Sequence, residues 1–513
     1  MTDAVDFLDQ FNVRRASDVT IRFTVLASAP GAEPPAKRQR CDTAHEEQYQ
    51  QQDQGREQEP GGQPDETSSQ GRLRAVVREI YGHSMILTKA SEWAERMLSP
   101  EWSAETPGVL DVELDDEGEV PAAELLFKSM YSTADAGRPL KGADQATLLQ
   151  VLLLADRLRA ERALCAAVNA LLATADTSMA GVLDWDTILA LYALPPAVAK
   201  SKALKPLWNA GAAALQHRLG DLDAAWLDAG CRAQLLALPF EALRHLLSDE
   251  RTRVSSENTV VYTVAAWIND NAGGVDGAMQ RAALAHYVRA PHLSKLYCAS
   301  AGSWLLTRWS PHISAADVHC ATDLQEADDS SKLRTRLLKA KGLPLAHRSA
   351  WRLPPRPTSS VKEAVVEWRV PLSEMRQLYE QAAAGAEVGE SLQVCSEAVV
   401  FQGCEWEARV KCKKREAGVI LRATLNVSLP PGCGAAAVLA AMVAFQKKPP
   451  ADDAHDPALR FSAWSIEVGT GQGCTDVFGL GELKEWDEVA WRNKGLVGQD
   501  GRVGVRFTIR GVK

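Results

Sequence analysis

A long helical stretch, residues 145–310, constrains the fold of this chain more than any other feature. Alanine and leucine dominate it, with breaks at the prolines 195–196 and at the glycines 220 and 273–274. No alternating strand pattern interrupts it, so antiparallel helix pairs are the natural packing. At 513 residues the chain is also too long for one hydrophobic core, and we expect about three domains.

The sequence before this stretch is typical of a small mixed domain of strands and helices. Residues 18–25 alternate apolar and polar side chains, which is the period-two pattern of a half-buried strand. Ser91 precedes a short helical segment and is expected to be its N-cap. We expect strands over residues 18–25, 72–81 and 109–114, and helices over 83–89, 91–98 and 122–131.

Residues 28–71 insert a polar segment into this first domain. They contain no Leu, Ile, Val, Phe or Trp. Such a segment cannot bury enough apolar surface to offset the entropy of ordering, so we expect a disordered hairpin loop between two strands. Its basic cluster between Lys37 and Arg40 is interpreted either as a solvated part of the loop or as a nuclear localisation signal.

After residue 361 the pattern changes from helices to strands. Turn signals at residues 430–432 and 469–473 separate short apolar runs, which is typical of an antiparallel β-sandwich. The polar residues 311–360 predict a short helix followed by a linker. Strands are expected over residues 364–370, 391–400, 405–412, 419–428, 461–468 and 502–509, with 437–445 either a strand or a short helix.

Composition and charge argue against several classes of protein. A net charge of -9 argues against a nucleic-acid binder that works by bulk electrostatics and against docking on an anionic membrane. The apolar runs are too short to cross a bilayer. Ten scattered cysteines without a C-x-x-C pair, and a start without a secretory leader, predict a soluble intracellular protein with free thiols.

No enzyme motif is present in the sequence. There is no G-x-S-x-G elbow, P-loop or H-E-x-x-H pattern. Cys395, Cys404 and Cys412 are spaced too loosely for a structural zinc site, so we expect buried thiols. We therefore expect no catalytic residues, no metal and no cofactor.

Short motifs give the chain a resemblance to BTB/POZ proteins. Residues 1–135, without the insertion, resemble a BTB/POZ domain, and residues 235–270 look like the BACK helical domain that follows it in many ubiquitin-ligase adaptors. Residues 401–403, Trp406 and residues 478–479 are similar to a MATH/TRAF-like sandwich. The motifs of the first match are SDVT (17–20), HSMIL (83–87), Ser91, ML (97–98), VEL (112–114) and MY (130–131).

The resemblance implies an α+β multidomain fold, in the domain order of plant-type BTB-BACK proteins. A BTB/POZ α/β unit over residues 1–135, with its insertion at 28–71, precedes an all-helical BACK domain over 140–310. A linker over 311–360 then leads to a C-terminal antiparallel β-sandwich over 361–513.

The family's function would be that of a substrate adaptor of a cullin-3 ubiquitin ligase, in the ubiquitin-like conjugation pathway. The BTB/POZ domain forms a homodimer and offers a groove to the cullin-3 N-terminal region, BACK extends that surface, and the terminal domain captures a protein substrate. The sequence does not name this substrate. The alternative is a non-ligase BTB scaffold for transcriptional or signalling assembly. Either protein is expected in the cytoplasm, the nucleus or both, without a nucleic-acid or membrane partner.

Cullin contact in this family depends on the loop after the helix at residues 97–98, where an apolar residue is followed two positions later by an acid. Trp102 can supply the apolar side chain, or it can pack on its own domain. Ala104 stands in the acid's place and Glu105 comes one residue late, which leaves cullin binding open. The expected cullin-binding residues are Met97, Trp102, Glu105 and Tyr131.

Two further groups of residues are candidates for binding surfaces. Asp18 and His83 are interpreted either as a charged pocket at the dimer groove or, for Asp18, as a buried carboxylate that caps local backbone. Tryptophans of the sandwich are candidates for a substrate groove, or they lie in its core. The expected dimer and pocket residues are Phe7, Phe11, Asp18 and His83, and the expected substrate residues are Trp464, Trp486 and Trp491.

Overall fold

The computed structural model describes two compact units, Met1–Thr187 with Pro195–Ala210 (unit 1) and Ile188–Leu194 with Gly211–Lys513 (unit 2). The predicted insertion at 28–71, with its basic cluster, and Ala104 and Glu105 lie outside the described residues. These residues are 6–15, 17–26, 74–102, 107–177, 183–271, 276–314, 317–318, 349–385, 391–433, 438–446, 462–468 and 472–512.

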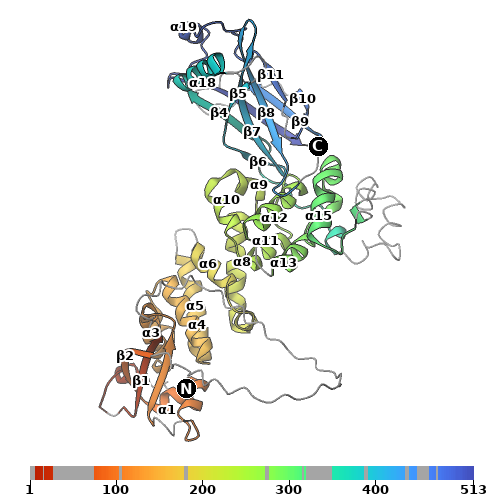
Figure 1. Ribbon diagram of the computed structural model, residues 1–513. Coiled ribbons are helices and arrows are strands. Elements are labelled where there is room, and N and C mark those ends of the chain that lie inside the picture. Colours follow the sequence, from red (N-terminus) through yellow and green to blue (C-terminus); the bar gives the residue numbers. More distant parts are fainter. Residues whose placement is uncertain are drawn as a thin grey trace, which may run out of the picture. The chain divides into compact units, whose positions relative to one another are not determined.

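Unit 1 contains a three-stranded sheet with the order β2-β1-β3, of which β1 and β2 are labelled in Figure 1. The central strand β1 is antiparallel to β2 and parallel to β3. Val19, Ile21 and Phe23 of β1 are buried, which confirms the predicted alternation. Leu26 pairs with Arg74, so the insertion connects two neighbouring antiparallel strands, as predicted. The strands are β1 Val19–Leu26, β2 Arg74–Gly82 and β3 Val109–Leu114.

Helices complete unit 1, and their starts follow the sequence. The Ser91 hydroxyl accepts a hydrogen bond from the Ala94 main-chain N–H at 3.1 Å, so Ser91 is the N-cap of α2, as predicted. Phe127 of α3 lies against Phe23 of β1, with the ring centres 5.9 Å apart. The helices are α1 Ser84–Ala90, α2 Glu92–Met97, α3 Val120–Tyr131, α4 Gln145–Arg157, α5 Glu161–Thr177 and α7 Pro196–Ala199.

Unit 2 begins with a helical layer in which one helix is buried almost all round. Every residue of α12 from Glu257 to Trp267 is buried, which is the pattern of a helix at the centre of a core. The described residues between 145 and 310 are mostly helical, as predicted. The helices are α9 Leu222–Leu227, α10 Ala229–Leu236, α11 Phe240–Ser248, α12 Glu257–Asn271, α13 Gly277–Ala285, α14 Lys295–Tyr297 and α15 Ser303–Trp309, while α6 Trp185–Tyr192 and α8 Lys205–Leu219 include residues of both units.

Two antiparallel sheets follow the helical layer along the chain in unit 2 (Figure 1). One has the order β10-β9-β12-β4, and the other has the order β11-β8-β7-β5 with β6 paired to β7. Trp368, Trp406 and Phe507 are buried among their strands. The strands are β4 Ala364–Pro371, β5 Ser391–Cys395, β6 Val399–Phe401, β7 Cys404–Arg415, β8 Gly418–Ser428, β9 Val438–Gln446, β10 Ser462–Glu467, β11 Gln472–Thr475 and β12 Arg502–Val512.

The two-sheet region departs from the prediction in four places. It contains the helices α18 (Leu372–Gly385) and α19 (Glu488–Asn493), which the strand pattern did not reveal. Leu372, Met375 and Tyr379 of α18 are buried at helical spacing. The single strand predicted over residues 391–400 is two strands, β5 and β6, and β11 was not predicted.

Residues 349–360, within the range predicted to be a linker, pack on the helical layer of unit 2. Arg356 Nε lies 3.3 Å from Glu257 Oε2, and both side chains are only 1% exposed. Burial raises the pKa of Glu257, while the neighbouring Arg356 acts to lower it. Arg356 Nη2 also donates to the main-chain oxygen of Leu247 at 2.8 Å. Removing either partner would leave an unpaired buried charge, so this pair fixes the segment on the helices.

The tip of the β6–β7 hairpin joins the sheets of unit 2 to its helices. Its residues Gln402 and Gly403 have positive φ angles of 50° and 81°, as in a two-residue hairpin turn. A Cβ atom on Gly403 would lie 2.5 Å from the backbone of Asn258 in α12. The Tyr297 hydroxyl donates to the Gly403 carbonyl oxygen at 3.0 Å, and the Tyr262 hydroxyl donates to the Glu405 carboxylate.

Gly403→Ala should destabilise unit 2 more than Gly432→Ala does. Gly432 also has a positive φ, 75°, but a Cβ there would meet no atom within 4 Å. Both variants carry the backbone cost of about 1–2 kcal/mol, and only Gly403→Ala adds overpacking of about 1–3 kcal/mol. Urea unfolding followed by tryptophan fluorescence measures the difference. Equal losses would mean that the approach to Asn258 does not constrain the hairpin.

Candidate protein-binding site

Asp18, just before β1, holds the start of helix α1. Its Oδ1 accepts a hydrogen bond from the Ser84 main-chain N–H at 2.8 Å, and its Oδ2 accepts one from the Ser84 hydroxyl. Ser84 is the first residue of α1, whose first N–H groups have no partner within the helix. The geometry therefore corresponds to the capping interpretation, although Asp18 is exposed.

Tyr131, at the end of α3, gathers most of the predicted dimer residues around its ring. Its hydroxyl accepts a hydrogen bond from the His83 main-chain N–H at 2.7 Å. Phe11 meets the ring edge-on, with the centres 5.4 Å apart. The Phe7 N–H donates to the Tyr131 carbonyl oxygen at 3.2 Å. Tyr131, which was predicted as a cullin contact, is fully buried. Its contacts tie the N-terminal segment to α3.

Local electrostatics fix the charge states in this cluster. Burial acts to raise the pKa of Asp18, but the hydrogen bonds from Ser84 outweigh it and hold that pKa below its ordinary value. Burial raises the pKa of Tyr131 to about 12. At neutral pH the cluster therefore pairs an ionised carboxylate with a neutral phenol, which is an arrangement for holding backbone in place.

Trp102 and Met85 are the most exposed large apolar side chains among the described residues of unit 1. Trp102 is 68% exposed and Met85 is 62% exposed. Met97, at the end of α2, is half-buried. Trp102 does not pack into its own domain in this structure, because most of its surface is open. Exposed aromatic side chains are typical centres of protein–protein contacts.

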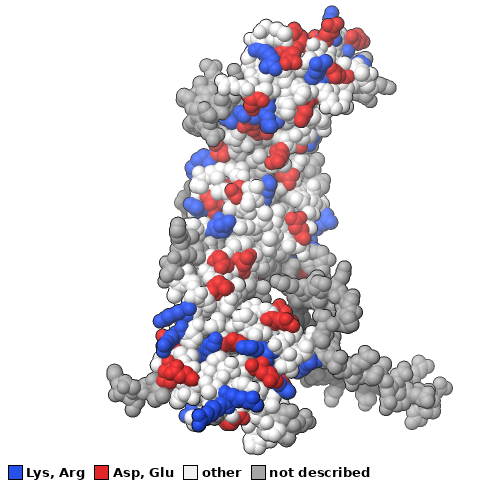
Figure 2. All heavy atoms as spheres, turned by 90° about the vertical axis from the view of Figure 1, so that its left-hand side faces the viewer, with Lys and Arg blue, Asp and Glu red and all other residues white. Residues whose placement is uncertain are grey.

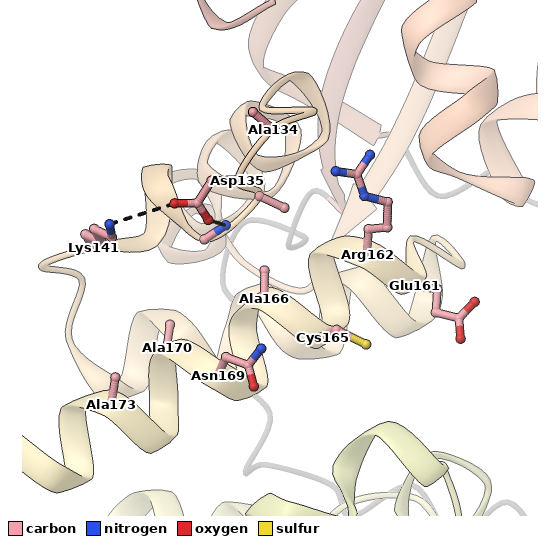
Figure 3. Close-up of a pocket in the computed structure, with 12 residues that line it drawn as sticks. Ala134, Asp135, Lys141, Glu161, Arg162, Cys165, Ala166, Asn169, Ala170 and Ala173 are labelled. Carbon is pink, nitrogen blue, oxygen red and sulfur yellow. Dashed lines mark hydrogen bonds and ion pairs between the residues drawn. The ribbon is translucent and has the colours of Figure 1, made fainter. Parts of the chain in front are cut away.

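A groove of about 610 Å³ runs along α5 in unit 1. Figure 3 shows Ala166, Asn169 and Ala170 along one side, with Asp135 and Lys141 on the other. The Lys141 Nζ lies 3.8 Å from Asp135 Oδ2. We did not predict this groove from the sequence. The alanines spaced along α5 are the signal that points to it, since small side chains leave room beside a helix.

The three tryptophans predicted for a substrate groove do not form one surface. Trp486 stacks on Trp491, with the ring centres 5.2 Å apart, and Trp491 is fully buried. Trp464 of β10 instead meets Phe507 of β12, in the same sheet, edge-on with the ring centres 6.1 Å apart. Trp464 and Trp486 are half-buried, so each presents only part of its ring.

Several other kinds of site find no support in the described ranges. None of the helices described is both long and apolar enough to cross a membrane. No group of three or more His, Cys, Asp or Glu side chains there is placed to hold a metal ion. On the face drawn in Figure 2, Lys and Arg side chains lie among Asp and Glu side chains. The described part of that face therefore carries no wide area of one sign.

The chain is similar to the Arabidopsis thaliana protein named BTB/POZ domain-containing protein At4g01160, at 24% identity over 244 residues. The match covers 46% of this chain and 43% of that protein's length. No protein-family model matches the chain. The similarity supports a BTB/POZ family. It agrees with the sequence motifs at Asp18, His83 and Tyr131, which lie together in unit 1.

Asp18→Asn should lower the stability of the protein at neutral pH, and this loss of stability should disappear in acid. The folded-state pKa of Asp18 is depressed, so its stabilisation is present above the unfolded pKa of about 4 and is lost as the pH falls through the folded value. Because Asp18 is exposed, we expect less than about 1 kcal/mol. Thermal unfolding from pH 7 to pH 3 measures this. Asp9→Asn, at another exposed acid of unit 1, is the control, and a difference in stability that does not shrink between pH 7 and pH 3 would contradict the assignment.

Proposed function

We propose that this protein is a non-enzymatic adaptor that dimerises through unit 1 and holds a protein substrate for a cullin-3 ubiquitin ligase. The BTB/POZ similarity supports an adaptor or scaffold family in general. The exposure of Trp102 is the observation that carries the finer assignment. An adaptor acts through its partners, and it needs neither a catalytic cluster nor a cofactor.

Trp102 follows α2 in the loop that the family resemblance assigns to cullin contact. A tryptophan that is 68% exposed leaves a large apolar area in water, and burying it in a partner recovers roughly 25 cal/mol for each Å² of apolar surface removed from water. Such desolvated aromatic residues dominate many interfaces. Met85, also exposed in unit 1, adds apolar area.

The groove on α5 supports the same assignment as a second contact. Ala166 and Ala170 line this groove, together with the charged side chains of Lys141, Glu161 and Arg162. An amphipathic helix docks in this kind of groove by burying its apolar face and leaving polar residues at the rim. A helical segment of the cullin N-terminal region is the partner we propose for it.

The alternative is a BTB scaffold that dimerises without binding a cullin. The acid missing at position 104 favours it, because Ala104 cannot form the charged contact that the family pattern carries. In both cases we propose that the two-sheet region of unit 2 has MATH/TRAF-like character and takes the client protein. We propose the cytoplasm, the nucleus or both as the location.

Trp102→Ala should weaken binding of the full-length protein to the cullin-3 N-terminal region. Size-exclusion co-elution at micromolar concentration and a titration by fluorescence anisotropy measure this. A central interface tryptophan is worth about 2 kcal/mol or more, so we expect at least a tenfold loss of affinity. Met279→Ala in α13, at a residue that is 69% exposed, is the matched control and should bind normally.

Two outcomes would decide against the ligase assignment. If the unaltered protein does not co-elute with the cullin region, the scaffold alternative replaces it. If analytical ultracentrifugation finds the full-length chain strictly monomeric at tens of micromolar, dimerisation through unit 1 is excluded. The adaptor and the scaffold assignments, which both require it, are then excluded too.

A further inference from the structure

Strand β7 of unit 2 presents positive side chains on its outer face. Its burial alternates, with Cys404, Trp406, Ala408, Val410 and Cys412 buried and the residues between them partly or fully exposed. Successive side chains of a strand point to opposite faces, so the exposed set shares the outer face. Beyond two glutamates near the hairpin, this set is Arg409, Lys411, Lys413 and Arg415.

The neighbouring strands extend this positive face. Lys411 pairs with Arg422 of β8, and directly opposite residues share a face of the sheet. Arg422 is the exposed residue in the middle of a mostly buried strand. On the other side Gln393 of β5 lies opposite Lys411 and brings no charge. We name Lys411, Lys413 and Arg422, with Arg409 and Arg415 beside them, the basic face.

Acids neutralise only the two ends of the basic face. Arg409 Nε lies 2.6 Å from Glu407 Oε2, and Arg415 Nη1 lies 3.7 Å from Glu482 Oε1. Lys411, Lys413 and Arg422 form no ion pair with any described residue. Three positive charges in the middle of the face therefore have no acidic partner in the described chain.

In the other sheet of unit 2, which has the order β10-β9-β12-β4, arginines are paired with acids. On β12, Arg506 Nη2 lies 2.8 Å from Glu367 Oε2, and Arg510 Nη2 lies 2.6 Å from Glu363 Oε2. These arginines are balanced by acids on or just before β4. The chain has a net charge of -9, so its acidic residues outnumber its basic ones. The unpaired positive charges of the basic face are therefore not a consequence of composition.

We propose that the basic face binds an acidic, extended segment of a partner polypeptide. Alternate residues of a strand are about 7 Å apart, so Lys411 and Lys413 match the spacing of acids at every second position of an extended peptide. Charge complementarity of this kind selects the partner and fixes its register. This inference rests on the proposed function, because it takes the basic face as the site where the adaptor binds its substrate. It names the substrate class as proteins with an acidic, extended segment.

The basic face suits a peptide better than a nucleic acid. Single-stranded nucleic acid is held by cations together with aromatic side chains on which bases stack. The described residues opposite the cations of β7 include Gln393, Thr424 and Ile420, and none of these is aromatic. The net charge of -9 also repels a long polyanion.

Binding of a fluorescein-labelled twelve-residue peptide with glutamate at every second position tests this on the full-length protein. The matched probe has glutamine in place of glutamate. The variant Lys411→Glu/Lys413→Glu/Arg422→Glu should bind the acidic peptide at least tenfold more weakly at low salt, by fluorescence anisotropy. The control variant Lys89→Glu/Lys200→Glu/Arg502→Glu changes the net charge equally at exposed positions and should bind as the unaltered protein does.

Three outcomes would overturn the inference. These are no preference for the glutamate peptide over the glutamine peptide, an equal loss in both variants, and tighter binding of single-stranded RNA that the basic-face variant abolishes. If charge reversal lowers the thermal midpoint, the milder variant Lys411→Gln/Lys413→Gln/Arg422→Gln replaces it, with at least a threefold loss expected.

The test separates this inference from the proposed function. The basic-face variant should still co-elute with the cullin-3 N-terminal region, and Trp102→Ala should still bind the acidic peptide. Loss of peptide binding alone removes the substrate class. Loss of cullin binding alone removes the ligase and leaves an adaptor with an acidic-peptide site.

Discussion

The close approach of Gly403 to Asn258 is the constraint on which unit 2 depends. Only a residue without a side chain fits between the hairpin and the first turn of α12. The Tyr297 hydroxyl then satisfies the carbonyl oxygen of Gly403 in a buried setting, where an unpaired polar group is costly. The hairpin, and with it the start of β7, is therefore seated on the helices.

This seating connects the interior of unit 2 to its proposed binding surface. Strand β7 begins directly after the hairpin tip, at Cys404. A shift of one residue in its register would turn every side chain to the opposite face. Trp406 and Val410 would become exposed, while Arg409 and Lys411 would be buried. The buried contact of the hairpin and the position of the basic face are thus fixed by the same register.

In unit 1, as in unit 2, the buried contacts that fix the fold are separate from the exposed side chains. Tyr131 is the centre of the buried contacts. Its ring and hydroxyl hold Phe11 and the main chain at His83, so the segment before β1 is fixed by contacts far along the chain. Trp102 and Met85 take no part in this cluster and remain in solvent. The residues that organise the unit and the residues available to a partner are therefore different sets.

Local patterns predicted most of the elements. The alternation at Val19, Ile21 and Phe23 predicted β1, and Ser91 predicted the cap of α2, because period and capping depend on neighbours in sequence. Helix α18 was missed because Met375 and Tyr379 occur within a region whose flanking runs all alternate as strands. The sequence also left open whether the tryptophans of the two-sheet region form a groove or lie in the core. Only the tertiary structure shows that Trp486 stacks on Trp491 while Trp464 meets Phe507.

The sequence by itself determined the mixed architecture, the position of the insertion and the alternation of charge along β7. These follow from side-chain period and composition, which need no knowledge of distant residues. The tertiary structure decided which charges stay unbalanced and which apolar residues stay exposed. Arg422 joins Lys411 only through strand pairing, and the groove on α5 exists only because residues 134–141 lie beside that helix. Pairings between distant segments depend on the whole fold, and no local pattern contains them.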